Sequence, residues 1–120
     1  MTSAQQWRDR LRRSLLAARK SRDTTSVTAI RSALSAIDNA ETPCPDRTDA
    51  RTGGVIAGAV SGVGSTESAR RVLTEDEIRT LIQAEIDERL TAANQYRVSG
   101  HPQRASALTA QAEVLAQLLG

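Results

Sequence analysis

The stretch LTEDEIRTLIQAEIDERLTAANQYRVSG, residues 73–100, decides the fold, because it combines a helix start signal with a long helical period. Thr74 and Glu77 form a capping box, in which each side chain bonds the backbone N–H of the other residue. Leu73 and Ile78 flank the box as a hydrophobic staple. The sequence therefore predicts one long helix that begins at Thr74.

Apolar side chains continue along one face of this helix. They are Ile78, Leu81, Ile82, Ile86, Leu90 and Ala93, with spacings typical of an α-helix. Gly100 supplies the left-handed stop, and Pro102 can open the next helix at its first position. A last helix repeats the spacing with Ala105, Leu108, Ala112, Leu115 and Leu119. Residues 73–119 are thus expected to form an antiparallel helical hairpin with small residues at half of its seam.

The N-terminal part of the chain predicts a second hairpin, over residues 3–41. Its first helix, from about Ser3 to Ser21, has an apolar face formed by Trp7, Leu11, Leu15 and Ala18. Asp23 and the Thr-Thr-Ser run after it offer N-cap side chains for a second helix. The apolar face of that helix is formed by Val27, Ile30, Leu34 and Ile37.

Residues 42–72 have a different texture, rich in Pro, Gly, Ser, Thr and Asp, which predicts a flexible connector. The 120 residues amount to one domain, 39% hydrophobic, with Trp7 and Tyr96 as its aromatic residues. We therefore expect a single all-α domain over residues 1–120. In it, two antiparallel helical hairpins pack as a four-helix arrangement.

The net charge of +2 hides a strong separation along the chain. Residues 1–22 carry seven basic side chains and Asp9 as their acidic one, whereas residues 75–88 carry six acidic side chains and Arg79 as their basic one. We expect the acidic helix to neutralise part of the basic N-terminus within the fold. The remaining basic residues would be free for a nucleic acid.

The basic N-terminus is the best candidate for a binding surface. Arg8, Arg12 and Arg19 fall on one line of the first helix, while Arg13 and Lys20 cover its back. Such a stripe can follow phosphates, although a merely solvated helix face explains it too. The residues predicted to bind nucleic acid are Arg8, Arg12, Arg13, Arg19, Lys20 and Arg31. Because no aromatic residue lies beside the stripe, the contact is expected to be electrostatic and tolerant of sequence.

The residues indicate no catalytic machinery, metal site or cofactor. His101 is the only histidine and lies at a turn, where capping is an ordinary role, and Cys44 is a single thiol between two prolines. The glycines of the connector match neither a dinucleotide fingerprint nor a P-loop. Glu85 is expected to form an ion pair, Arg89 lying one turn away. The lone cysteine and the absence of a long apolar run favour a cytoplasmic protein without a membrane span.

Two stretches resemble the GatB/YqeY-domain family. The first runs from Ile30-Arg31 to Asn39 and Glu41, and the second is the whole run 73–100. The family motif residues are Ile30, Arg31, Asn39, Glu41, Thr74, Glu77, Glu85, Arg89, Tyr96 and Gly100. The resemblance implies a short form of the family, because fuller members continue into a small C-terminal helical subdomain.

The resemblance implies an all-helical module that occurs alone in bacteria and as the tail of the B subunit of the glutamine-dependent Asp/Glu-tRNA amidotransferase. It implies tRNA and amidotransferase subunits as partners. The family is associated with carbon–nitrogen ligase activity that uses glutamine as amido-N-donor, but the residues of this chain indicate no such activity of its own. A non-catalytic binding module is therefore the favoured function. The alternative is a protein-interaction or self-association module without RNA binding, with the small-residue seam of the last helix as its surface. The oligomeric state is left open.

Overall fold

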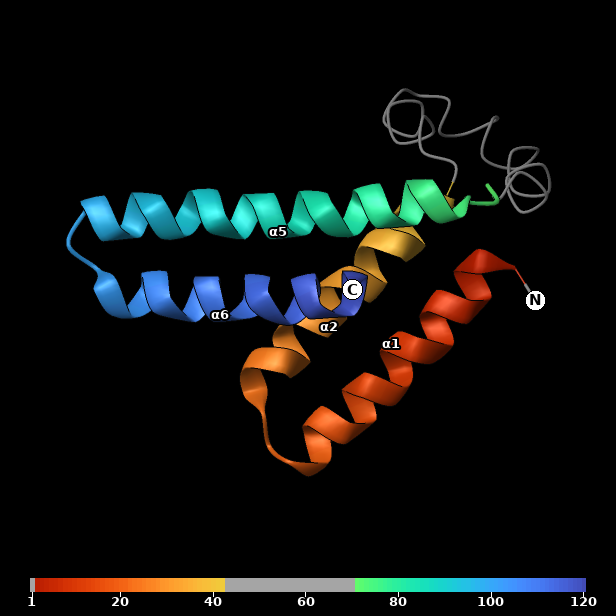
Figure 1. Ribbon diagram of the computed structural model, residues 1–120, viewed down its shortest axis with the longest axis horizontal. Coiled ribbons are helices and arrows are strands. Elements are labelled where there is room, and N and C mark those ends of the chain that lie inside the picture. The colour runs from red at the N-terminus through yellow and green to blue at the C-terminus, as the bar shows by residue number, and fades with distance from the viewer. Residues whose placement is uncertain (1, 43–70) are drawn as a thin grey trace, which may run out of the picture.

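The computed structural model describes residues 2–42 and 71–120, and within these ranges the chain is helical, with four helices and no strand. They are α1 (Ser3–Lys20), α2 (Thr24–Glu41), α5 (Glu75–Val98) and α6 (Pro102–Leu119), shown in Figure 1. The predicted all-α class is confirmed. The predicted connector lies, apart from its first and last residues, outside the described residues, and so does Cys44.

The local signals of residues 73–102 act as predicted. The Glu77 backbone N–H donates to Thr74 Oγ1 at 3.1 Å, and the Thr74 N–H donates to Glu77 Oε1 at 2.9 Å, which completes the capping box. The pKa of the Glu77 carboxyl is lowered, mainly by the bond from the Thr74 backbone. Gly100 has φ +87°, the left-handed conformation that ends a helix, and Pro102 is the first residue of α6.

The N-terminal helices are also capped by side chains. Thr2 forms a second capping box with Gln5 at the start of α1. Asp23 starts α2, because its carboxylate accepts from the Ser26 backbone N–H at 3.1 Å and from the Ser26 hydroxyl at 2.7 Å. These bonds stabilise the charged carboxylate, and the Ser26 hydroxyl contributes most to lowering the pKa of Asp23.

Helix α2 lies at the centre of the arrangement, in contact with α1, α5 and α6. Figure 1 shows α5 and α6 side by side and antiparallel, with α1 inclined to them and α2 crossing behind. The largest fully buried side chains come from all four helices and are Leu11, Ile30, Ile37, Ile78, Ile82 and Leu115. Where α5 and α6 meet at residues 99–101, the pair extends beyond the other two helices (Figure 1). No helix in the described ranges is long and apolar enough to cross a membrane.

Candidate nucleic-acid interface

Arg8 serves the fold rather than the surface. Its guanidinium donates to Asp38 Oδ1 at 2.9 Å and forms a second, shorter ion pair with Glu41. The Glu41 side chain is 8% exposed and that of Arg8 16%, whereas Asp38 is 62% exposed. The pKa of Arg8 is raised, chiefly by the hydrogen bond to Glu41. Arg8 therefore joins the start of α1 to the end of α2, although the sequence places it in line with Arg12.

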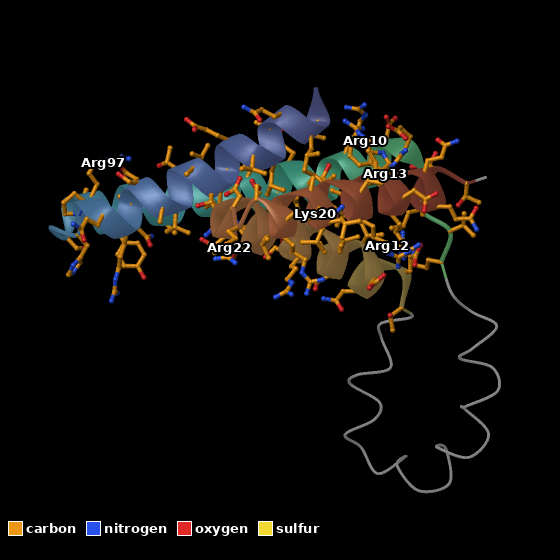
Figure 2. All side chains as sticks on the ribbon, turned by 90° about the horizontal axis from the view of Figure 1, so that it is seen from below. Arg10, Arg12, Arg13, Lys20, Arg22 and Arg97 are labelled. Atoms are coloured by element: carbon orange, nitrogen blue, oxygen red, sulfur yellow. The ribbon has the colours of Figure 1, made fainter. Side chains whose placement is uncertain are left out.

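The other residues of the predicted surface are exposed. Within the described ranges they form no ion pair, and neither does Arg22, which follows α1. The predicted residues in this group are Arg12, Arg13, Arg19, Lys20 and Arg31. Figure 2 shows Arg12, Arg13, Lys20 and Arg22 spread along one side of α1 and the turn after it. We call the exposed set Arg12, Arg13, Arg19, Lys20, Arg22 and Arg31 the α1–α2 basic surface.

The acidic start of α5 does not neutralise the basic surface, contrary to the expectation from the charge separation. Glu75 binds Arg79 at 2.9 Å within its own helix and accepts from Trp7 Nε1 at 3.1 Å. Glu77 binds Arg71 at 2.9 Å. Between the described parts of α1 and α5 there is no ion pair. The exposed cations of α1 are therefore not ion-paired with α5 in the described ranges.

Trp7 fastens α1 to the two C-terminal helices. Besides the bond to Glu75, its ring is covered by the guanidinium of Arg10 at 4.6 Å and by that of Arg79 at 5.6 Å. Both arginines also donate to the last carbonyls of α6, Arg10 to Leu118 and Arg79 to Leu119. Arg10 is thus held by the fold and is not part of the basic surface.

The residues that match the family motif lie in several parts of the structure. Glu85 forms the expected ion pair with Arg89, at 2.9 Å within α5, and Arg89 Nε also donates to Gln111 of α6 at 3.0 Å. Tyr96 lies near the α5–α6 turn, where the His101 ring meets it edge-on at 6.1 Å between centroids. His101 occupies the N-cap position of α6 but makes no side-chain capping bond, so the predicted capping role is wrong.

A polar concavity of about 470 Å³ lies between α2 and α5 and was not predicted from the sequence. It brings together Arg31, Asn39 and Glu85, three of the family motif residues, with the hydroxyls of α2. Its polar lining consists of Thr28, Arg31, Ser32, Ser35, Asn39 and Glu85. A sequence signal existed, because the steps from Thr28 to Ser32, Ser35 and Asn39 are four, three and four residues, which is one helix face.

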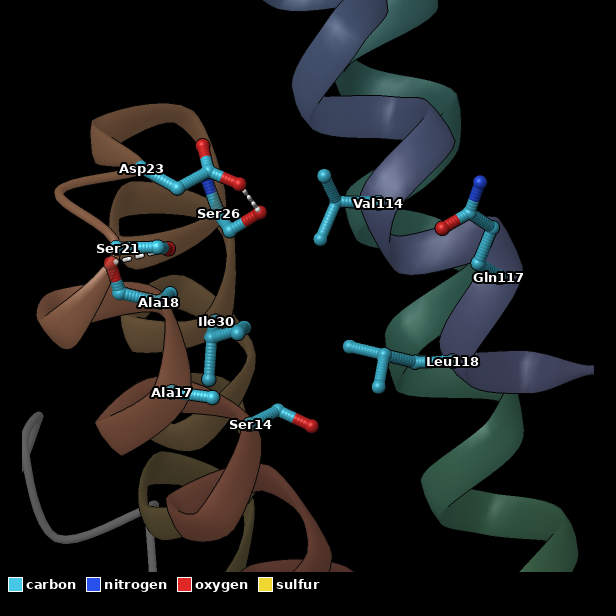
Figure 3. A pocket seen from close by; sticks show the side chains of 10 residues that line it. All are labelled: Ser14, Ala17, Ala18, Ser21, Asp23, Ser26, Ile30, Val114, Gln117 and Leu118. Carbon is cyan, nitrogen blue, oxygen red and sulfur yellow. Dashed lines mark hydrogen bonds between the residues drawn. The ribbon is translucent and has the colours of Figure 1, made fainter.

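A second concavity, of about 350 Å³, separates the end of α6 from α1 and α2. Figure 3 shows Val114 and Leu118 of α6 facing Ile30 and Ala17 across it, with the Asp23–Ser26 hydrogen bond at one edge. Its lining combines apolar side chains with serine hydroxyls and carries one charged group, Asp23. This groove offers little attraction to an anion.

Among residues 2–42 and 71–120, no group of three or more His, Cys, Asp or Glu side chains is placed to hold a metal ion. Comparison with protein-family models, with curated proteins and with solved structures gives no match.

Proposed function

We propose that this chain is a non-catalytic RNA-binding module that docks on phosphates through the α1–α2 basic surface. The observation that carries the proposal is a difference between the basic residues of α1. Arg8 is ion-paired inside the fold, whereas the α1 members of the basic surface are exposed and form no ion pair in the described ranges. Cations that the fold leaves unpaired are available to displace counterions from a phosphate backbone.

The distribution of charge over the molecule supports this orientation. Residues 2–42 carry eight basic and four acidic side chains, a net charge of +4, and residues 71–120 carry five basic and seven acidic ones, a net charge of −2. An anionic polymer is therefore attracted to the α1–α2 side and repelled from much of α5.

The choice of tRNA among RNAs, and of amidotransferase subunits as further partners, rests on the resemblance of residues 30–41 and 73–100 to the GatB/YqeY-domain family. In this proposal the two helical pairs form one GatB/YqeY-like four-helix domain. The pair α1–α2 carries the RNA contact, and the pair α5–α6 braces it through Trp7.

The test is the salt dependence of tRNA binding by the double variant Arg12→Gln/Arg19→Gln. Each phosphate contact contributes about 0.9 to the log–log salt slope for a duplex and about 0.7 for a single strand. Loss of two contacts should therefore lower the slope by about 1.4 to 1.8 and weaken binding at low salt. Both residues are exposed and form no ion pair in the described ranges, so the fold should be preserved.

The matched control is Arg97→Gln/Arg104→Gln, which removes the same charge from the last turn of α5 and the first turn of α6. Figure 2 shows Arg97 at this far end of the α5–α6 pair. The control should leave the slope near that of the wild-type chain. Equal losses in both double variants would mean that only total charge matters, and the α1–α2 surface would not be the binding site.

A second candidate function is a protein-interaction module, and the groove between α6 and α1 favours it. The alanine seam of α6 is not its surface, since Ala105 and Ala112 are almost completely buried within the chain. The exposed parts of Val114 and Leu118 would take that role. Self-association that persists at high salt and disappears in Leu118→Gln would favour this function. A monomer at all salt concentrations would exclude self-association.

A further inference from the structure

The polar concavity between α2 and α5 contains hydroxyl groups that the fold does not use. Thr28, Ser32 and Ser35 make no side-chain hydrogen bond to any residue in 2–42 or 71–120, and neither does the Asn39 amide. Some hydroxyls elsewhere bond back to their own helix, as Thr109 does to the Ala105 carbonyl at 2.9 Å, whereas others, such as Thr91 and Ser106, form no side-chain hydrogen bond in the described ranges either. What sets this face of α2 apart is that its unbonded hydroxyls line one concavity together with Arg31 and Glu85.

These side chains are not explained by the stability of α2. Serine, threonine and asparagine are poorer helix formers than alanine in a helix interior, because their side chains compete for backbone groups. Here they neither cap the helix nor fill the core, since Thr28, Ser35 and Asn39 are exposed and Ser32 is half-buried. Alanine at the same positions would suit the helix better. The polar groups are therefore available to a ligand.

The charged groups around the hydroxyls define the ligand's chemistry. Arg31 is exposed beside them and, in the described ranges, has no acidic partner, so it can take a phosphate. Glu85 is half-buried and fixed by Arg89 at 2.9 Å, which leaves it an oriented acceptor for a hydroxyl donor. Serine, threonine and asparagine side chains are among the usual contacts to phosphate and sugar in nucleic-acid complexes.

We propose that this concavity binds a ribose-phosphate unit of RNA, with Arg31 on the phosphate and Ser32, Ser35, Asn39 and Glu85 on the sugar. The 2′-hydroxyl is both donor and acceptor and distinguishes RNA from DNA. The concavity is open to solvent, so it can take one unit of a strand that continues on both sides. Arg31 belongs to both the concavity and the α1–α2 basic surface, so it links the two in this proposal.

This inference rests on the proposed function and adds sugar discrimination to it. The basic surface alone attracts RNA and DNA equally, since both carry the same phosphates. The concavity favours RNA by about fivefold if one net hydrogen bond to the 2′-hydroxyl is gained.

The experiment compares a single-stranded RNA with the DNA of identical sequence, both fluorescently labelled, by anisotropy titration at low salt. The variant is Ser32→Ala/Ser35→Ala, and the control is Thr91→Ala/Ser106→Ala, which removes two exposed hydroxyls outside the concavity. Both variants introduce a good helix former and should fold. We expect the wild-type chain and the control to prefer RNA about fivefold, and the variant to bind both strands with the affinity that the wild-type chain has for DNA.

A wild-type chain that binds both strands equally would overturn the sugar assignment and leave the basic surface intact. Retention of the RNA preference in Ser32→Ala/Ser35→Ala would overturn it too. Binding of neither strand would overturn the proposed function as well. Adenosine monophosphate, added as a competitor, tests whether the concavity binds a free nucleotide instead of a unit of RNA. Competition at concentrations comparable to those of the RNA strand would identify a free nucleotide as the ligand and contradict the assignment to RNA.

Discussion

Replacing Arg8 by methionine should destabilise the protein by about 3 kcal/mol without removing a nucleic-acid contact. The Arg8–Glu41 ion pair is mostly buried, and removing one partner of a buried pair typically costs about 3 to 5 kcal/mol. We take the lower end, because Glu41 has a further interaction besides that with Arg8, Arg8 keeps some exposure, and methionine preserves the packing of the aliphatic stem. The bond to Asp38 adds little, since exposed pairs contribute about 0 to 1 kcal/mol.

The assay is urea denaturation followed by the fluorescence of Trp7, the only tryptophan in the chain. Arg12→Met is the matched control, because it makes the same replacement one turn along α1 at an exposed residue without an ion pair in the described ranges. It should change the free energy of unfolding by no more than about 0.5 kcal/mol. If the two variants differed by less than 0.5 kcal/mol, the assignment of Arg8 to the fold would be refuted.

Two further predictions concern helix ends. Gly100→Ala should lower the free energy of unfolding by about 1 to 2 kcal/mol in a thermal or urea melt, because a Cβ at φ +87° strains the backbone although it meets no atom within 4 Å. An unchanged stability would argue against the left-handed stop. The stability should also fall as the pH drops below about 4.5, since the pKa values of Asp23 and Glu77 are lowered in the folded state. The charged carboxylates contribute stability above their unfolded-state pKa values, and this contribution is lost as they are protonated. Asp23→Asn/Glu77→Gln should show a shallower acid slope in melts recorded across this range, and a slope equal to that of the wild-type chain would contradict the assignment.

Features that depend on a few neighbouring residues were predictable from the sequence. The Thr74–Glu77 capping box, the Gly100 stop and the Pro102 start each follow from a local pattern, and the structure has all three. The Glu85–Arg89 pair is of the same kind, since residues four apart on a helix are neighbours. Local rules therefore give the helix boundaries to within a residue or two.

Features that depend on how the helices meet were not predictable. Arg8 and Arg12 are both arginines and lie on the same line of α1. Their roles differ because Asp38 and Glu41 of α2 lie beside Arg8. His101 stands at a helix start, yet its ring lies against Tyr96 instead of capping. The polar face of α2 becomes a candidate binding site only because Glu85 of α5 lines the same concavity. A periodicity assigns residues to a face, whereas packing decides what that face meets.

The most direct test of the central claim is a map of the backbone-amide signals of the ¹⁵N-labelled chain titrated with tRNA at low salt. If RNA binds to α1 and α2, shifts and line broadening should concentrate at Arg12, Arg19 and Arg31, while the amides of Arg97 and Arg104 at the far end of the α5–α6 pair stay unchanged. Perturbations centred on that far end, or none at all, would contradict an RNA interface on α1 and α2.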